Sequence, residues 1–195
     1  MRTTVQLIPQ SVVRPRLQAG LSNLQIMIGT LISGILIMGG MVMIRQIEKA
    51  KVDNEVRELS RLKKKTSSLA AQRGTLEGVT RQTAVARDFF DPGVLSGAAG
   101  SQTVRNAWGG TIDVIPVSFG SPWNALIFRY TNVSSSACKQ LGMQVGDAVP
   151  GMQVMAQWVK TTPALGGTGA PVIAELIARC DQGANNVTID FYLTK

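Results

Sequence analysis

Hydrophobic and polar positions divide the chain into a long apolar stretch, an amphipathic stretch and a mixed C-terminal part. Residues 17–44 contain no Asp, Glu, Lys or Arg over 28 residues. A helix rises about 1.5 Å per residue, so this stretch is long enough to cross the roughly 30 Å hydrocarbon core of a bilayer. The pattern therefore predicts a membrane-spanning helix near the start of the chain.

A short basic segment precedes the apolar stretch. Residues 1–20 contain three Arg and no acidic residue, and two Pro in this segment oppose a continuous helix. The apolar run is too long for the hydrophobic region of an ordinary signal peptide, and residues 45–49 after it offer no small-x-small cleavage site. The local sequence instead suits cleavage before the apolar run, after Gly20.

From Arg45 the pattern turns amphipathic with no helix breaker between the two stretches. We expect the charged residues, Glu55 and Glu58 among them, to lie on other faces than the apolar ones, and Gly74 is a suitable end. We therefore predict one helix from Leu21 to about Ala71, whose second half packs on the downstream residues. A coiled-coil partner is the alternative, although the spacing is too irregular for regular heptads. The apolar stripe consists of Ile44, Ile47, Val52, Val56, Leu59, Leu62 and Leu69.

The C-terminal part shows alternating, β-branched runs separated by turn signals. Pro116 predicts that the first strand is an edge strand or contains a bulge. The pattern leaves open whether residues 172–179 form a helix or a strand. The expected architecture is α+β, with one long N-terminal helix packed on a mainly antiparallel sheet. The predicted strands are 111–119, 125–130, 154–159 and 187–193, and the predicted short helices are 79–90 and 137–141, the latter capped by a Ser at 134–136.

Composition argues against catalysis. The chain contains no His, which removes the usual general base, the Ser-His-Asp triad and His-containing zinc sites. The Ser run at 134–136 therefore has no base to activate it, and the Gly-rich run at 166–169 lacks the lysine of a phosphate loop. We predict neither an enzyme nor a bound cofactor or metal.

Net charge adds little to this picture. The formal charge is +8, and the three Arg of residues 1–20 leave 8 − 3 = +5 for the remainder. Bases and acids are interleaved there, and no basic stripe alternates with aromatic residues, so a nucleic-acid surface is not indicated.

The two cysteines, Cys138 and Cys180, both lie in the C-terminal half. Together with an export-type N-terminus, such a pair suggests one disulfide bond. Two buried free thiols are the alternative.

Taken together, these features resemble a type IV prepilin. The resemblance is carried by the basic leader ending at Gly20, the apolar helix that continues into an amphipathic one, and a C-terminal β domain with one cysteine pair. A first mature residue Leu21 rather than Phe, and the sequence Asn-Ala-Trp-Gly-Gly at 106–110, are similar to the type IVb branch, especially pilins of conjugative and enteric thin pili. The resemblance spans the whole chain.

The resemblance implies cleavage after Gly20 by a prepilin peptidase, methylation of the new amino group on Leu21, and storage in the bacterial inner membrane. It also implies a Cys138–Cys180 disulfide and extraction by a pilus assembly machinery into an extracellular helical homopolymer. Most family members carry Glu at the fifth mature position, where this chain has Gln25. The small residues expected to allow close helix packing in the fibre are Gly29, Gly34, Gly39 and Gly40.

The implied division of the chain is a cleaved leader at 1–20, a membrane and fibre-core helix at 21–44, an amphipathic continuation at 45–71 and a globular head at 72–195. Two further functions stay open. The first is a minor pilin or pseudopilin of a secretion system, an alternative that rests on Gln25 in place of the usual Glu. The second is an uncleaved, signal-anchored periplasmic binding domain. What a fibre would contact, whether a host-cell surface or a DNA-transfer partner, is not encoded in any motif that we recognise.

Overall fold

The computed structural model of the chain describes residues 22–161 and 169–194, with side chains from residue 45 onward. The chain forms two units, residues 1–44 and 45–195. Helix α1 extends over Ser22–Arg73 and contributes its residues 45–73 to the second unit. No helix among the described residues is long and apolar enough to cross a membrane, and the side chains of the predicted membrane segment at 21–44 lie outside the described part.

The apolar stripe of α1 is buried as its periodicity predicts. Val52 and Leu62 are fully buried, and Leu59 and Leu69 almost so. Ile47 does not follow the prediction: its side chain is 58% exposed, and the buried part of the stripe begins at Val52. The helix ends where Gly74 adopts φ +74° and donates its backbone N–H to the carbonyl of Ala70 at 2.8 Å, a left-handed cap that favours glycine.

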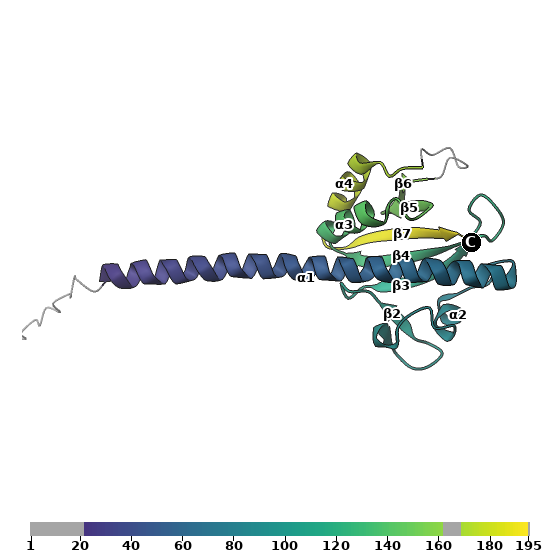
Figure 1. Ribbon diagram of the computed structural model, residues 1–195, viewed down its shortest axis with the longest axis horizontal. Helices are drawn as coiled ribbons and strands as arrows, with labels where there is room; N and C mark the ends of the chain where they lie inside the picture. The colour runs from purple at the N-terminus through teal and green to yellow at the C-terminus, as the bar shows by residue number, and fades with distance from the viewer. Residues whose placement is uncertain (1–21, 162–168, 195) are drawn as a thin grey trace, which may run out of the picture. The chain divides into compact units, whose positions relative to one another are not determined.

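We refer to the residues that follow α1 as the head. Its centre is a seven-stranded sheet with the order β1-β2-β3-β4-β7-β5-β6, and every neighbouring pair is antiparallel. Figure 1 shows residues 45–73 of α1 running alongside the strands. The predicted α+β class with an antiparallel sheet is confirmed. The strands are β1 (Leu95–Ser96), β2 (Thr103–Arg105), β3 (Thr111–Val117), β4 (Ala125–Val133), β5 (Gly151–Val154), β6 (Gln157–Lys160) and β7 (Val187–Thr194).

The two faces of the sheet carry different clusters because successive side chains of a strand point to opposite sides. On the face toward α1, Phe128, Tyr130 and Phe191 are fully buried in the main core together with Leu59 and Leu62. The opposite face carries a smaller apolar cluster built from Phe119, Ala125, Ile127 and Tyr192.

Three short helices in the described part of the chain accompany the sheet. Helix α2 (Arg81–Ala86) is capped by Thr80 and lies near the β2 end of the sheet, whereas α3 (Ser135–Val145) and α4 (Ile173–Gln182) lie near the β5–β6 end (Figure 1). The predicted cap on α3 is present, since the Ser134 hydroxyl accepts a hydrogen bond from the N–H of Ala137 at 3.2 Å. Helix α4 settles the open choice at residues 172–179 in favour of helix. A 3-10 turn, η1, covers Pro92–Val94.

The predicted strand at 154–159 is wrong. These residues form a tight hairpin between β5 and β6, in which Met155 and Ala156 adopt φ values of 51° and 62°. Such a two-residue turn normally uses Asn or Gly, so neither residue signals it in the sequence.

Pro116 lies in a strand that is interior to the sheet order but locally at an edge. Beyond Ile112, β3 pairs with β4 alone among the described strands. The missing N–H of Pro116 therefore costs no hydrogen bond to β2, and the predicted edge position holds for this part of β3.

The hairpin offers a direct test of backbone strain. Ala156→Gly removes the cost of a side chain at positive φ, so we expect the free energy of unfolding to rise by about 1 kcal/mol. Denaturant unfolding of the full chain in detergent micelles measures this change. Ala148→Gly, at an exposed position without positive φ, is the matched control and should lower stability slightly. Destabilisation by both substitutions would contradict the strain at Ala156.

Candidate functional site: the seam between helix α1 and the head

The residues predicted to act in processing and assembly lie outside the part of the chain whose side chains the structure describes. They are Gly20, Leu21, Gln25, Gly29, Gly34, Gly39 and Gly40. The predicted disulfide is confirmed: Cys138 of α3 and Cys180 of α4 are bonded, fully buried, and have Cα atoms 5.7 Å apart. The bond joins the two helices that cover the β5–β6 end of the sheet.

The described site of greatest interest is the seam, by which we mean the polar contacts that residues 45–73 of α1 make with the head. Apolar burial alone holds a helix on a sheet, but it only weakly specifies the rotation of the helix about its axis and its position along the sheet. Polar side chains that find single partners fix both, because a buried polar group left without a partner is costly. The contacts of the seam occur at several places along the helix.

The first contact joins Glu48 to the start of α3. The hydroxyls of Ser134 and Ser136 both donate to Glu48 Oε1, the latter at 2.7 Å. The carboxylate therefore lies beside the N-terminus of α3, where the helix dipole favours a negative charge. The same Ser134 caps α3, so one hydroxyl serves the helix start and the seam together.

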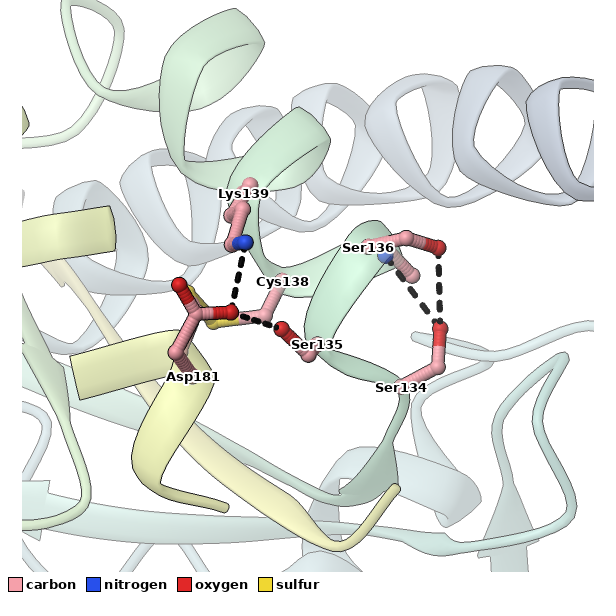
Figure 2. Close-up of a disulfide and its surroundings, with 8 residues drawn as sticks. Ser134, Ser135, Ser136, Cys138, Lys139 and Asp181 are labelled. Carbon is pink, nitrogen blue, oxygen red and sulfur yellow. Dashed lines mark hydrogen bonds and ion pairs between the residues drawn. A yellow bond between two sulfur atoms is a disulfide. The ribbon is translucent and has the colours of Figure 1, made fainter. Parts of the chain in front are cut away.

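The disulfide and a second polar cluster stabilise the same end of α3. Figure 2 shows Asp181 of α4 accepting a hydrogen bond from the Ser135 hydroxyl at 2.8 Å and pairing with Lys139 at 2.5 Å. Both hydrogen bonds lower the pKa of Asp181, that of Lys139 contributing most. Helices α3 and α4 are thus joined by a covalent bond and by polar contacts across the same boundary.

The second contact of the seam centres on Glu55 and the turn at residues 106–110. Glu55 is only 7% exposed, and its Oε1 accepts the backbone N–H of Ala107 at 2.8 Å. The prediction that Glu55 lies on another face than the apolar stripe is wrong. Glu55 is three residues after Val52 and four residues before Leu59, so the helical period places its side chain on the buried face. The partner lies 52 residues further along the chain, so only the tertiary structure brings the two together.

The turn itself is held by Asn106. Its Oδ1 accepts the backbone N–H groups of Trp108 at 3.0 Å and Gly110 at 2.9 Å, and its Nδ2 donates to the carbonyl of Thr131 on β4 at 2.7 Å. A Cβ at Gly110 would lie 1.9 Å from that carbonyl oxygen, so no other residue fits there. The Asn-Ala-Trp-Gly-Gly sequence is therefore a turn that presents one backbone N–H to α1.

Burial changes the protonation behaviour of this region. Loss of solvent raises the pKa of Glu55 and of Glu58, while the Ala107 hydrogen bond on the former and the Arg61 charge near the latter act in the opposite direction. Tyr130 of β4 is fully buried, and burial followed by the negative charge of Glu55 raises the pKa of its hydroxyl.

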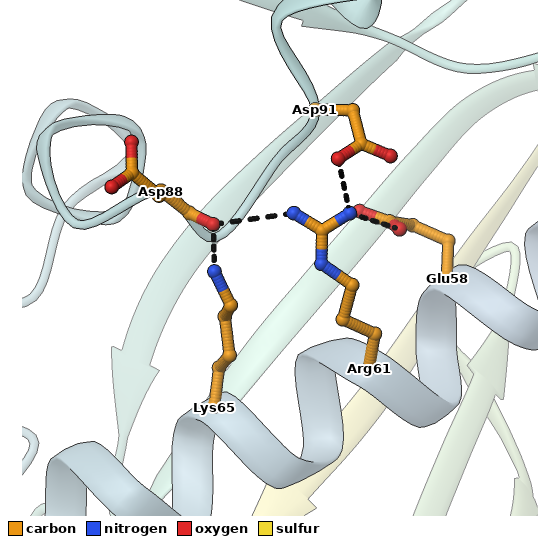
Figure 3. Close-up of polar contacts among 5 residues, drawn as sticks. All are labelled: Glu58, Arg61, Lys65, Asp88 and Asp91. Atoms are coloured by element: carbon orange, nitrogen blue, oxygen red, sulfur yellow. Dashed lines mark hydrogen bonds and ion pairs between the residues drawn. The ribbon is translucent and has the colours of Figure 1, made fainter.

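The third contact joins α1 to the loop between α2 and β1 (Figure 3). Arg61 forms ion pairs with Asp91 and, at 3.4 Å, with Glu58, and its Nη2 donates to the backbone carbonyl of Asp88 at 3.3 Å. Lys65 donates to the same carbonyl. The hydrogen bond to Asp91 raises the pKa of Arg61.

A further contact lies toward the other end of the sheet. Lys63 of α1 donates to the carbonyl of Ala148 at 2.7 Å, and Lys160 of β6 donates to the carbonyl of Gly146. Both ammonium groups thus bind carbonyls just after the C-terminus of α3, where the helix dipole favours positive charge.

A cavity of about 540 Å³ lies beside the seam, between α1, the loop with Phe90 and Asp91, and the turn at Asn106. Three of the charged residues that line it, Glu58, Arg61 and Asp91, pair with one another. Within the described residues, no group of His, Cys, Asp or Glu is arranged to hold a metal ion. The seam therefore fixes the helix on the head through groups that are mutually paired.

Comparison with known proteins gives a family. The family model described as PilS N terminal matches residues 49–192, which is most of the chain and includes nearly the whole seam. The chain belongs to the PilS family. This is a family of pilus subunits, which are structural proteins and not enzymes.

Solved structures agree on the fold. A type IVb pilin from Salmonella typhi is 21% identical with a TM-score of 0.54, and the match covers 73% of this chain and 99% of that one. The type IV pilin TcpA from the Vibrio cholerae El Tor biotype is 15% identical with a TM-score of 0.53, covering 73% and 98%. The resemblance to type IVb pilins inferred from the sequence is confirmed. No curated protein sequence matches the chain.

The buried carboxylate of Glu55 makes stability depend on pH. Its folded-state pKa is raised above the unfolded value, so its contribution to stability is fully present below about pH 4.5 and is lost as the pH rises through the folded-state pKa. Glu55→Gln keeps an oxygen for the Ala107 N–H without the charge. We expect it to raise the free energy of unfolding by roughly 1 kcal/mol at pH 7 and to have no effect at pH 4.

Denaturant unfolding of the full chain in detergent across this pH range measures the effect. Glu77→Gln, at an exposed position in the loop after α1, is the matched control and should change stability at neither pH. A Glu55→Gln variant that is less stable than the wild type at pH 7 would show that the charge itself stabilises the seam.

The close approach at Gly110 predicts a steric requirement. Gly110→Ala places a methyl group against the Thr131 carbonyl, a backbone atom that cannot move alone, and should cost more than about 2 kcal/mol of unfolding free energy. Gly93→Ala adds the same methyl group where no atom lies within 4 Å and should change stability by less than about 0.5 kcal/mol. Thermal unfolding followed by near-UV circular dichroism compares the two, and equal effects would contradict the packing at the 106–110 turn.

Proposed function

We propose that this chain is the structural subunit of a type IVb pilus, processed after Gly20 and polymerised non-covalently through its N-terminal helix. The observation that carries the proposal is the family match over residues 49–192. This range includes most of the amphipathic helix, most of the head and both cysteines of the disulfide. The division expected from the sequence belongs to the same proposal: leader at 1–20, fibre-core helix at 21–44, amphipathic helix at 45–71 and head at 72–195.

The physics of the chain supports this route. A subunit that moves from lipid into a fibre keeps the apolar residues 21–44 away from water in both states, so the transfer needs little hydrophobic free energy. Small residues allow helices to approach closely in such a core, and Gly29, Gly34, Gly39 and Gly40 supply them. In this proposal the inner membrane stores the precursor, a prepilin peptidase removes the leader, and an assembly machinery adds the subunit to the fibre.

Gln25 favours a second candidate within the same machinery. A neutral amide at the fifth mature position can accept a hydrogen bond from a neighbouring Leu21 ammonium but cannot form an ion pair. A minor pilin or pseudopilin, present in few copies, would have less need of that pair. The share of this chain in purified fibres distinguishes the two candidates, because a major subunit dominates the mass of the fibre.

Processing is the first prediction to test. Intact mass and N-terminal sequencing of the chain, extracted from the membranes of cells that carry a prepilin peptidase, should give a protein that begins at Leu21. The mass should include one added methyl group and the loss of two hydrogens for the Cys138–Cys180 bond. Gly20→Val is the control and should leave the leader attached. A wild-type chain that begins at Met1, in cells that process another prepilin, would instead support an uncleaved signal-anchored domain.

A further inference from the structure

The face of the sheet that points away from α1 carries a continuous transverse row of polar and aromatic side chains. The strand registers place Trp158 opposite Gln153, Gln153 opposite Asp190, Asp190 opposite Arg129, and Arg129 opposite Asp113. Residues directly opposite each other in antiparallel strands point to the same face, so these five side chains form one row across β6, β5, β7, β4 and β3. With strands spaced about 4.8 Å apart, the row is roughly 19 Å long.

The row faces away from the main core. On β4, the neighbours Phe128 and Tyr130 are fully buried toward α1, so Arg129 between them points to the opposite side. The side chains of Arg129 and Asp113 are each 40% exposed, and Trp158 is 40% exposed. The row is therefore accessible at both ends and at Arg129, whereas the Asp190 side chain in its middle is only 3% exposed.

Charges in the row alternate and are already paired. Arg129 binds Asp190 through two hydrogen bonds of 2.8 Å, and Arg81 of α2 pairs with Asp113 at 2.6 Å. The row itself holds one cation and two anions, and with Arg81 of α2 the two ion pairs carry no net charge. A polyanion such as nucleic acid needs an excess of positive charge along its path, which this surface does not offer.

Trp158 is held rigidly at one end of the row. Its ring packs on Tyr192 with centroids 4.8 Å apart and on Phe119 at 6.0 Å, and those two rings lie 5.0 Å from each other. Gly151 makes this packing feasible, since a Cβ there would lie 2.8 Å from the Phe119 ring and 3.2 Å from the Trp158 ring. An exposed aromatic ring whose orientation is fixed in advance loses little entropy when a ligand stacks on it.

A rigid aromatic face next to uncharged and internally paired polar groups suits one class of ligand. Sugar rings present a face of C–H groups, which stacks on the electron-rich face of an indole, and an edge of hydroxyls, each of which can donate and accept hydrogen bonds. Gln153 offers both a carbonyl and an amide, Asp113 a further acceptor and Arg129 further donors. We propose that this row is a binding site for a neutral oligosaccharide that lies across the strands with one sugar stacked on Trp158.

This inference goes beyond the role of a pilus subunit and does not depend on polymerisation. The test uses the full chain in detergent micelles, so a failure to assemble would not affect it. The probes are immobilised neutral tetrasaccharides built from glucose, galactose, mannose or N-acetylglucosamine, with a heparin tetrasaccharide of similar length as the anionic comparison. We expect at least one neutral probe to bind more tightly than heparin at physiological salt.

Matched variants locate the site. Trp158→Ala should weaken binding of the neutral probe by about tenfold or more, the effect of losing an aromatic anchor, and Trp158→Phe should retain part of the affinity. Gln153→Ala should weaken it roughly two- to tenfold through the lost hydrogen bonds, and it decides the matter if Trp158→Ala fails to fold. Trp123→Ala removes another exposed tryptophan, 38% exposed and outside the row, and should change nothing.

Three outcomes would overturn the proposal. The first is that no neutral tetrasaccharide binds, and the second is that only heparin binds, which would indicate a general attraction between a basic protein and a polyanion. The third is that the folded row variants, Trp158→Ala and Gln153→Ala, bind no more weakly than Trp123→Ala, which would place the contact elsewhere on the head.

Discussion

One face of the antiparallel sheet must be covered, and residues 45–73 of α1 cover it. Phe128, Tyr130 and Phe191 would expose large apolar surfaces without Leu59 and Leu62 against them. Burial of side chains of this size contributes about 1.5–3 kcal/mol each, so the helix and the sheet depend on each other for stability. The amphipathic helix is therefore part of the core of the head, and the short strands at the ends of the sheet add to a core that is already formed.

Polar groups in this interface make it specific at some cost. A buried carboxylate such as Glu55 is unfavourable by itself, and the Ala107 N–H compensates for only part of that cost, which is why its pKa rises. In exchange, the helix has one rotation in which Glu55 meets the 106–110 turn while Arg61 meets Asp91 and Lys63 meets Ala148. An entirely apolar stripe could slide or rotate by a turn at much lower cost.

The parts of this fold that the sequence predicts are those with local causes. Gly74 ends α1 through its own backbone, Ser134 caps α3 three residues away, and the alternation of residues 187–193 reports a strand with two different faces. The features that the sequence did not predict depend on contacts between distant residues or on local signals that the sequence does not show. The hairpin at Met155 contains no Gly or Asn, and α4 exposes Ile173 and Ile177 while it buries Leu176, which blurs its helical period. The position of Glu55 on the buried face follows from the helical period, but its hydrogen-bond partner lies in a turn encoded 52 residues away. The row on the outer face depends on strand registers.

The placement of the seam contacts bears on how the molecule withstands tension. Glu48, Glu55, Arg61 and Lys63 of α1 each hold a different part of the head: the start of α3, the 106–110 turn, the loop after α2, and the loop after α3. Because residues 45–73 of α1 run alongside the strands (Figure 1), a lengthwise pull on this part of the helix loads the four contacts at the same time, whereas a pull away from the sheet would break them one after another. Four separate contacts would therefore share such a pull.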